Sequence, residues 1–213
     1  MGIKERRERE KSERRELILR AAINVYMKEG YPGTTMDKIA EIAELSRATL
    51  YLYFKTKDEI FVNAIVNHSD YFTQLLDGIF ARREEIGSGL SRELWKSFKS
   101  FYDRDPATMN ATLYFHQGQM LKSLPESLRL ELDKSGSKNF NRLYAIMEYG
   151  INAGFFRSYN PKTLAEFVWT AFLGIIHLEN SKAAMSRKTH IEETWTLGLD
   201  ILERGIGNGS IDS

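Results

Sequence analysis

Residues 34–60 constrain the fold of this chain more than any other stretch, because they read as three short helices in immediate succession. Their sequence is TTMDKIAEIAELSRATLYLYFKTKDEI. Thr34 is an N-cap candidate, and the carboxylate of Asp37 can reach back to the free amides of a first helical turn. Apolar residues then recur at spacings of three and four. We therefore expect a short amphipathic helix over residues 35–43.

Two further helix starts follow in the same stretch. Ser46 is an N-cap candidate for a second helix over residues 47–54. Leu50 and Phe54 lie one turn apart in this helix and are predicted to form its buried side. A capping box beginning at Thr56 then predicts the start of a third helix.

Two short helices joined by a tight turn are the plan of a helix-turn-helix DNA-binding motif. With the apolar side of the second helix buried, its outward residues are Arg47, Ala48, Tyr51 and Leu52. Arg47 can bind guanine through two hydrogen bonds, and Ala48 permits a close approach to a thymine methyl group. Tyr51 offers a hydroxyl or a ring face, whereas Leu52 offers only apolar contact. We therefore expect these residues to face the major groove.

A dense series of motifs covers residues 17–61, about the first quarter of the chain. The motifs are Gly30-Tyr31, Thr34-Thr35, Ile39-Ala40, Ala43-Glu44-Leu45-Ser46-Arg47-Ala48-Thr49-Leu50-Tyr51 and Tyr53-Phe54-Lys55-Thr56-Lys57-Asp58-Glu59. In this order they resemble the TetR-type family of transcriptional regulators. The resemblance implies an all-α homodimer. It also implies an N-terminal three-helix helix-turn-helix domain followed by a larger helical ligand-binding and dimerisation domain.

Two residues depart from the usual pattern of that family. Glu44 stands where the family most often has glycine in the turn, so a left-handed backbone at this position would be strained. Leu52 stands where a polar or aromatic residue is common, which leaves the operator sequence open. The expected DNA contacts, to bases and to phosphates, are Thr35, Ser46, Arg47, Ala48, Thr49, Tyr51, Leu52, Tyr53 and Lys57.

The chain divides into four expected regions: a charged arm (1–16), the helix-turn-helix domain (17–60), a helical ligand-binding and dimerisation domain (61–205) and a flexible tail (206–213). The arm alternates Arg and Lys with Glu. It is either a solvated helix with Glu–Arg pairs or a segment that lies along DNA. In the third region, a helix to about residue 80 is expected first, and Ser135-Gly136-Ser137 is expected to interrupt a later one.

The last two expected helices, residues 164–178 and 191–202, are more apolar than one core requires. A symmetric pair of them would form a four-helix interface, and Gly174 would let another backbone cross closely. The alternative is a monomer core. The residues expected at the interface are Trp169, Phe172, Leu173, Gly174, Ile176, Trp195, Leu199 and Leu202.

Aromatic residues and methionines recur at helical spacing in the middle of the chain. They form either plain core or a mostly apolar pocket for a hydrophobic or amphipathic small molecule. The candidate pocket residues are Trp95, Phe98, Tyr102, Met109, Phe115, His116, Tyr144 and Met147.

Composition excludes several other classes of protein. The chain of 213 residues has no cysteine, so disulfides and thiolate metal sites are impossible. No apolar run is long enough to span a bilayer, which favours a cytoplasmic location without membrane contact. Its four histidines are scattered outside any catalytic motif, and we expect no enzyme activity, metal or cofactor.

The sequence thus predicts a homodimeric, ligand-responsive transcriptional regulator that binds double-stranded DNA. We expect a repressor released from a palindromic operator by a small-molecule inducer. The formal net charge of +1 is lower than DNA binding usually requires, so this hypothesis depends on the motif. The alternative is a helical ligand-binding or interaction protein without specific DNA binding.

Overall fold

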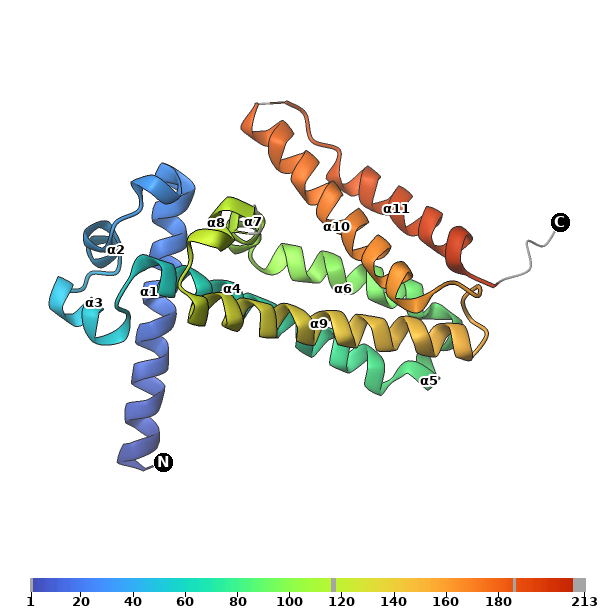
Figure 1. Ribbon diagram of the computed structural model, residues 1–213, viewed down its shortest axis with the longest axis horizontal. Coiled ribbons are helices and arrows are strands. Elements are labelled where there is room, and N and C mark those ends of the chain that lie inside the picture. The colour runs from blue at the N-terminus through green and yellow to red at the C-terminus, as the bar shows by residue number, and fades with distance from the viewer. Residues whose placement is uncertain (1, 116–117, 186, 209–213) are drawn as a thin grey trace. The chain divides into compact units, whose positions relative to one another are not determined.

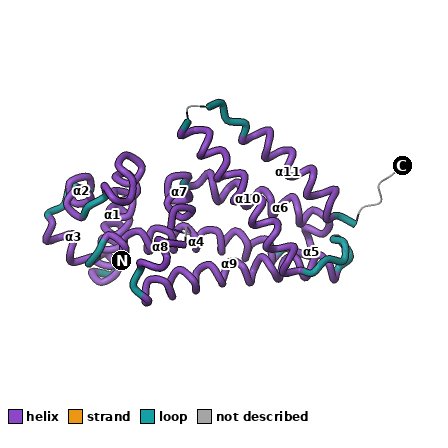
Figure 2. Tube along the Cα trace, turned by 45° about the horizontal axis from the view of Figure 1, so that its top comes forward, coloured by secondary structure: helices purple, strands orange, loops and turns teal. Residues whose placement is uncertain are grey.

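The computed structural model describes residues 2–115, 118–185 and 187–208, and the regular structure in these ranges is helical (Figures 1 and 2). The predicted all-α fold is confirmed. The helices are α1 (Ile3–Gly33), α2 (Met36–Ile42), α3 (Arg47–Tyr53), α4 (Lys57–Ala81), α5 (Arg83–Ile86), a 3-10 turn (Gly87–Gly89), α6 (Leu90–Arg104), α7 (Pro106–Phe115), α8 (Gly118–Ser123), α9 (Glu126–Asn152), α10 (Pro161–Ala184) and α11 (Ile191–Ile206).

The chain packs as two compact units, and α4 and α9 each contribute residues to both. The first unit comprises residues 1–68 and 105–134, and the second comprises 69–104 and 135–213. This division differs from the expected domains, because residues 105–134 belong to the first unit. Among them Phe115 is buried in the same hydrophobic core as α1 to α3.

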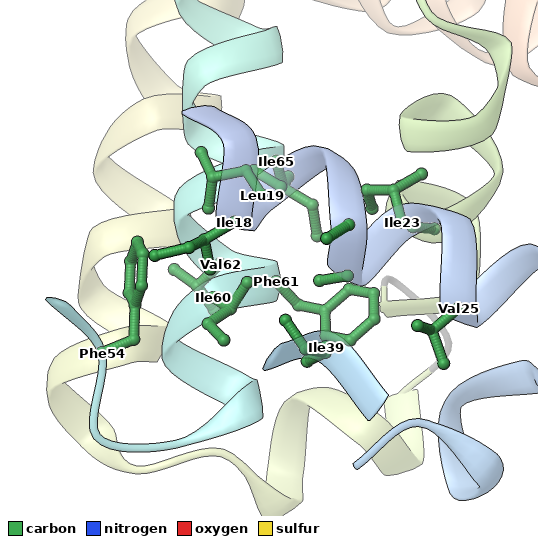
Figure 3. Close-up of a cluster of buried hydrophobic side chains, with 14 of the residues drawn as sticks. Ile18, Leu19, Ile23, Val25, Ile39, Phe54, Ile60, Phe61, Val62 and Ile65 are labelled. Atoms are coloured by element: carbon green, nitrogen blue, oxygen red, sulfur yellow. The ribbon is translucent and has the colours of Figure 1, made fainter. Parts of the chain in front are cut away.

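The core of the first unit is formed where α1, α2 and the start of α4 meet (Figure 3). Ile18 from α1, Ile39 from α2 and Phe61 from α4 are each fully buried. Leu50 and Phe54 are also fully buried, which confirms the predicted inner side of α3. Burying a side chain of this size contributes about 1.5–3 kcal/mol relative to leaving it exposed. This shared core fixes α3 against the rest of the unit.

The charged N-terminal arm is helical and continues directly into α1. Its exposed surface has pairs at i,i+4 spacing, with Arg6 Nε 2.8 Å from a Glu10 carboxylate oxygen and Arg9 Nε 3.6 Å from Glu13. These pairs agree with the solvated-helix alternative, and DNA contact by the arm stays a hypothesis. Helix α1 is kinked at Gly30, which has a φ of 68° before one more helical turn.

The second unit has an aromatic core to which α4, α6, α10 and α11 contribute. Phe98 on α6 stacks on Phe172 of α10 with ring centroids 5.0 Å apart. Trp95 stacks on Trp195 of α11 at 4.7 Å, and its indole N–H donates to the Trp195 carbonyl at 2.9 Å. Helices α10 and α11 run antiparallel beside each other in both views (Figures 1 and 2).

Helix α9 is continuous through residues 135–137, so the expected interruption there is wrong. Tertiary contacts override the weak helix propensity of this Ser-Gly-Ser segment. The Ser135 hydroxyl is 2.8 Å from that of Ser69 on α4. One turn further on α9, the Asn139 amide donates to the Ser69 hydroxyl at 2.6 Å and accepts from the Thr73 hydroxyl at 2.5 Å. We call these four residues the polar seam.

Residues 206–208, expected at the start of a flexible tail, make contacts with residues 154–157. Gly207 forms an antiparallel bridge with Phe156. The Asn208 side-chain amide donates to the carbonyls of Gly154 and Phe156 at 3.1 and 3.2 Å. Residues 206–208 are therefore attached to the second unit, and 209–213 lie outside the described residues.

Candidate nucleic-acid interface

Helix α2 begins one residue later than the sequence suggested. Its N-cap is Thr35, whose hydroxyl accepts from the Lys38 amide at 3.3 Å. Thr34 is fully buried, and its hydroxyl donates to the Gly30 carbonyl at 2.8 Å. Thr34 thus closes the C-terminal turn of α1, because a buried hydroxyl requires a partner.

The turn between α2 and α3 contains the left-handed residue that the sequence indicated. Glu44 has a φ of 54°, and within the described residues it is the only non-glycine with a positive φ. The Leu45 amide donates to the Ala40 carbonyl at 2.9 Å and closes the end of α2. A left-handed residue with a Cβ costs about 1–2 kcal/mol, so the turn retains strain that glycine would avoid.

Helix α3 presents the predicted residues outward. Its N-cap Ser46 accepts from the Thr49 amide at 3.1 Å. Arg47 and Ala48 are exposed, Tyr51 is half-buried, and 81% of the Leu52 surface is exposed. We call Arg47, Ala48, Tyr51 and Leu52 the outer face of α3.

Arg47 is oriented by neighbours on both sides. Its Nε lies 3.1 Å from a carboxylate oxygen of Asp37 on α2, and its guanidinium lies 5.7 Å from the centre of the Tyr51 ring. A hydrogen bond with Tyr51 and the charge of Asp37 raise the pKa of Arg47, so the guanidinium is charged. Both ion-pair partners are exposed, which leaves the guanidinium accessible to another acceptor.

Lys57 has a structural role that sequence reasoning missed. Its ammonium donates to the carbonyls of Tyr31 at 2.9 Å and Thr34 at 3.0 Å and lies 4.2 Å from the centre of the Tyr31 ring. These carbonyls end α1, where a cation is favourable. A phosphate contact by Lys57, as the sequence suggested, would require it to leave both carbonyls.

The start of α4 has a modified capping box. The Thr56 hydroxyl accepts from the Glu59 amide at 3.1 Å, as predicted. The Glu59 carboxylate accepts from the amide of Lys55 at 2.7 Å, one residue before the expected partner. The predicted start of the third helix at Lys57 is confirmed.

Arg15 connects the arm to the helix-turn-helix, whereas the sequence placed it only within the charged arm of residues 1–16. Its guanidinium donates to the Asn63 side chain at 2.7 Å and lies 4.4 Å from the centre of the Phe54 ring. One signal was available, because Arg15 precedes Ile18 and Ala22 at helical spacing and so falls on the buried stripe.

The residues expected at a dimer interface fall on two sides of α10 and α11. Phe172, Ile176, Trp195 and Leu202 are buried in the second unit, so they are core within one chain. Trp169, Leu173 and Leu199 are half-buried. Gly174 is exposed, and a Cβ there would meet no atom from elsewhere in the described chain within 4 Å. The exposed apolar residues on these helices are Phe167 (61%), Leu178 (53%), Leu197 (57%) and Ile201 (59%). We call these four the outer face of the α10–α11 pair.

An apolar hollow of about 590 Å³ lies in the second unit, mainly between α10 and α11. Phe167 and Ile201 line it, and Trp95 of the expected ligand pocket contributes to it. The other lining residues are Tyr159, Asn160, Thr163, Leu164, Ala171, Ile175, Gly198, Leu202, Gly205 and Ile206. Gly198 permits this packing, because a Cβ there would approach the Trp95 ring to 2.6 Å.

The expected ligand-pocket residues are distributed over both units. Met109 and Phe115 are buried in the first unit, and Phe98 and Met147 are buried in the second. Tyr102 and Tyr144 are half-buried, and the Tyr144 hydroxyl donates to Glu148 at 3.0 Å. His116 lies outside the described residues. The positions of these residues do not establish a pocket.

Within the described ranges, no group of three histidine or acidic side chains could hold a metal ion. No helix there is both long and apolar enough to cross a bilayer. A tight turn, a capped second helix with an exposed outer face and a common core define a helix-turn-helix domain.

Comparison with known proteins shows which family this chain resembles. The family described as "Bacterial regulatory proteins, tetR family" matches residues 18–64. The HTH-type transcriptional regulator YfiR of Bacillus subtilis is 28% identical over 187 residues, which cover 83% of this chain and 86% of YfiR. IcaR of Staphylococcus epidermidis, a negative transcriptional regulator of a biofilm operon, is 28% identical over 115 residues, 54% of this chain and 57% of IcaR. These matches support a TetR-type helix-turn-helix regulator.

Some alignments are shorter, and that with YhgD of B. subtilis spans 35% of the relative's length. Solved structures extend the similarity of fold to most of the chain. FadR from B. subtilis, solved in complex with stearoyl-CoA, superposes with a TM-score of 0.68 at 19% identity, covering 90% of this chain and 98% of FadR.

Proposed function

We propose that this protein is a homodimeric transcriptional repressor that binds a palindromic operator and leaves it when a small molecule binds. The observation that supports this most directly is the outer face of α3, where Arg47 is charged, oriented and accessible. A guanidinium in this position is suited to the N7 and O6 atoms of guanine. The proposed activity is binding rather than catalysis, and we place it in the cytoplasm with the operator.

Phosphate contacts would fix the docking of α3 in the groove. Thr35 and Ser46 are exposed at the N-termini of α2 and α3, where backbone amides and hydroxyls favour anions. Thr49 and Tyr53 are half-buried beside them. We retain these four residues as contacts and treat Lys57 as the weakest member of the predicted set.

Dimerisation would place two recognition helices on half-sites about one DNA turn apart. The outer face of the α10–α11 pair supports this proposal, because four large apolar side chains there are more than half exposed in one chain. Contiguous exposed apolar surface marks protein interfaces. We therefore propose that the dimer interface lies on the opposite side of α10 and α11 from Phe172 and Ile176. Gly174 stays in the proposed interface.

Release by ligand requires the second unit to act on the first. Helix α4 begins beside α3 and ends in the second unit, so a ligand that favours another direction of α4 would change the spacing of the recognition helices. The stearoyl-CoA bound to FadR, a protein of the same fold, supports a hydrophobic or amphipathic ligand class. The similarity to IcaR, a negative transcriptional regulator, supports the proposal that this protein is a repressor.

The experiment that tests the proposal is selection of bound fragments from randomised duplex DNA at fixed, near-physiological salt, because phosphate contacts make affinity depend steeply on salt. Sedimentation on the same protein gives its oligomeric state. We expect a dimer and a palindrome with half-sites about one turn apart. A folded dimer that enriches no sequence would contradict operator binding and favour a DNA-independent ligand-binding protein.

A further inference from the structure

The outer face of α3 consists of two columns of different chemistry. Arg47 and Tyr51 are four residues apart and in contact, and they form a polar column. Ala48 and Leu52 are also four residues apart and form an apolar column beside it. The polar column is linked to Asp37 on α2. The apolar column ends in a side chain that is 81% exposed.

Leu52 is the most exposed large hydrophobic residue in the described part of the chain, where the next, Leu130 and Phe167, each reach 61%. Its side chain leaves apolar surface in water at the centre of the face that would enter the major groove. Burial within the chain does not explain a leucine here, because the inner side of α3 is formed by Leu50 and Phe54.

One apolar group on base edges faces the major groove, the C5-methyl group of thymine. A leucine can contact this methyl but cannot hydrogen-bond to any base. The Cα atoms of Ala48 and Leu52 are separated along the helix by about 6 Å, close to two base-pair steps of about 3.4 Å. Ala48 has only a methyl side chain, so it would let the backbone approach the bases on the same side.

We propose that Leu52 determines sequence specificity by packing on the C5-methyl group of a thymine in each operator half-site. This inference rests on the proposed operator binding. The same methyl group occurs on 5-methylcytosine, and thymine is the source to which we commit. Leu52 would thereby set one position of the operator through the methyl group, whereas Arg47 sets another through hydrogen bonds.

The test replaces each thymine of the selected operator by deoxyuridine, which removes the methyl and leaves every hydrogen-bonding group unchanged. We expect one position per half-site at which the change weakens binding about fourfold, the equivalent of one buried methyl at about 0.8 kcal/mol. Substitution in both half-sites should weaken binding about sixteenfold. If no thymine position responds in a specific complex, the inference is wrong while operator binding stands.

Leu52→Ala identifies the residue that senses the methyl. The variant should bind the thymine and deoxyuridine operators equally at the responding position, and its fold should persist because Leu52 is exposed. Leu130→Ala is the matched control, since Leu130 is an exposed helical leucine of the same unit away from α2 and α3. It should keep the fourfold response. If Leu52→Ala keeps it too, another residue contacts the methyl and the assignment fails.

A third arm separates the methyl from other features of the thymine base pair. At the responding position, a 5-methylcytosine–guanine pair should bind more tightly than a cytosine–guanine pair by a similar factor. Equal binding of these two would overturn the methyl contact. A failure to enrich any operator beforehand would instead count against the proposed function, so the two failures are distinguishable.

Discussion

The outer face of α3 and the outer face of the α10–α11 pair both expose large apolar side chains, but their surroundings differ. On α3, Leu52 stands beside Arg47 and Tyr51, and Arg47 is paired with Asp37. On the helix pair, Phe167 and Ile201 line one apolar hollow, and Leu178 and Leu197 add further exposed apolar surface. The first face is mixed at the scale of single side chains, whereas the hollow on the second is lined mainly by apolar side chains.

This difference indicates two kinds of partner. An isolated apolar group among charged and aromatic groups matches base edges, where one methyl lies among hydrogen-bonding atoms. An exposed apolar surface matches another protein surface of the same kind. The comparison therefore predicts that an added charge will disrupt binding at the outer face of the α10–α11 pair. On the outer face of α3, by contrast, the charge of Arg47 should be required for binding.

The largest expected effect is that of Phe167→Asp on dimerisation. The residue is 61% exposed in one chain, so the monomer should fold, whereas a carboxylate buried without a partner at an interface costs several kcal/mol. We expect the dimer dissociation constant to rise at least about 100-fold by sedimentation. Leu130→Asp, equally exposed in the first unit, should leave the dimer unchanged. An intact Phe167→Asp dimer would remove this face from the interface.

Arg47→Ala should have the next largest effect, this time on DNA. We expect a loss on the order of 1–3 kcal/mol on the preferred operator and relaxed specificity at one base position. Binding titrations on the operator and on single-base variants measure both quantities. If all sequences weaken equally, Arg47 contacts phosphate and not a base. Sedimentation should show the same dimer as the wild type.

Glu44→Gly should stabilise the protein by about 1 kcal/mol, since glycine adopts a φ of 54° without a Cβ penalty. Chemical unfolding of the variant measures the change. Glu41→Gly is the matched control in the neighbouring helix, and it should destabilise by a similar amount because glycine is a poor helix former. A loss of stability in Glu44→Gly would mean that the Glu44 side chain makes a compensating contact.

The smallest effect concerns Glu179, which is 4% exposed on α10. Hydrogen bonds from Lys182 at 2.5 Å and the His190 amide at 2.9 Å lower its pKa, and burial opposes them. The carboxylate therefore stabilises the fold above the ordinary glutamate pKa of about 4.3, and the contribution disappears as pH falls through the lowered folded value.

Glu179→Gln should accordingly lower the free energy of unfolding at neutral pH by about 1 kcal/mol or less. The difference from wild type should vanish as the pH decreases below about 4. Glu166→Gln, an exposed carboxylate on the same helix, serves as the control and should show a much smaller difference at either pH. A difference that persists in acid would mean that Glu179 acts through packing rather than charge.

Much of the fold was predictable because its signals are local. N-cap residues predicted α3 and the start of α4. Apolar spacing predicted that Leu50 and Phe54 form the buried side of α3. The side of α10 that faces outward was not predictable, because large apolar residues surround most of the helix and periodicity then gives little direction. Phe172 is buried because Phe98 of α6 stacks on it, whereas Phe167 on the same helix is exposed. The sequence alone does not distinguish these two phenylalanines.

The roles of Lys57 and Arg15 were not predicted from the sequence, because they depend on contacts with residues far away in the chain. Lys57 resembles a surface cation in the sequence, but the carbonyls it binds are 26 and 23 residues away. Arg15 lies within a charged run, and its partners are in α3 and α4. The interruption expected at 135–137 failed for the same reason, because Ser135 and Asn139 bond to α4.

The polar seam has a mechanical consequence for the two helices that run through both units. Its hydrogen bonds form only when one particular turn of α4 lies opposite one particular turn of α9. A slip of one turn, about 5.4 Å, would move Asn139 from Thr73 toward the fully buried Leu76 and leave its amide unpaired. The seam therefore fixes the register of α4 against α9 within the second unit. Its hydrogen bonds oppose sliding of one helix along the other.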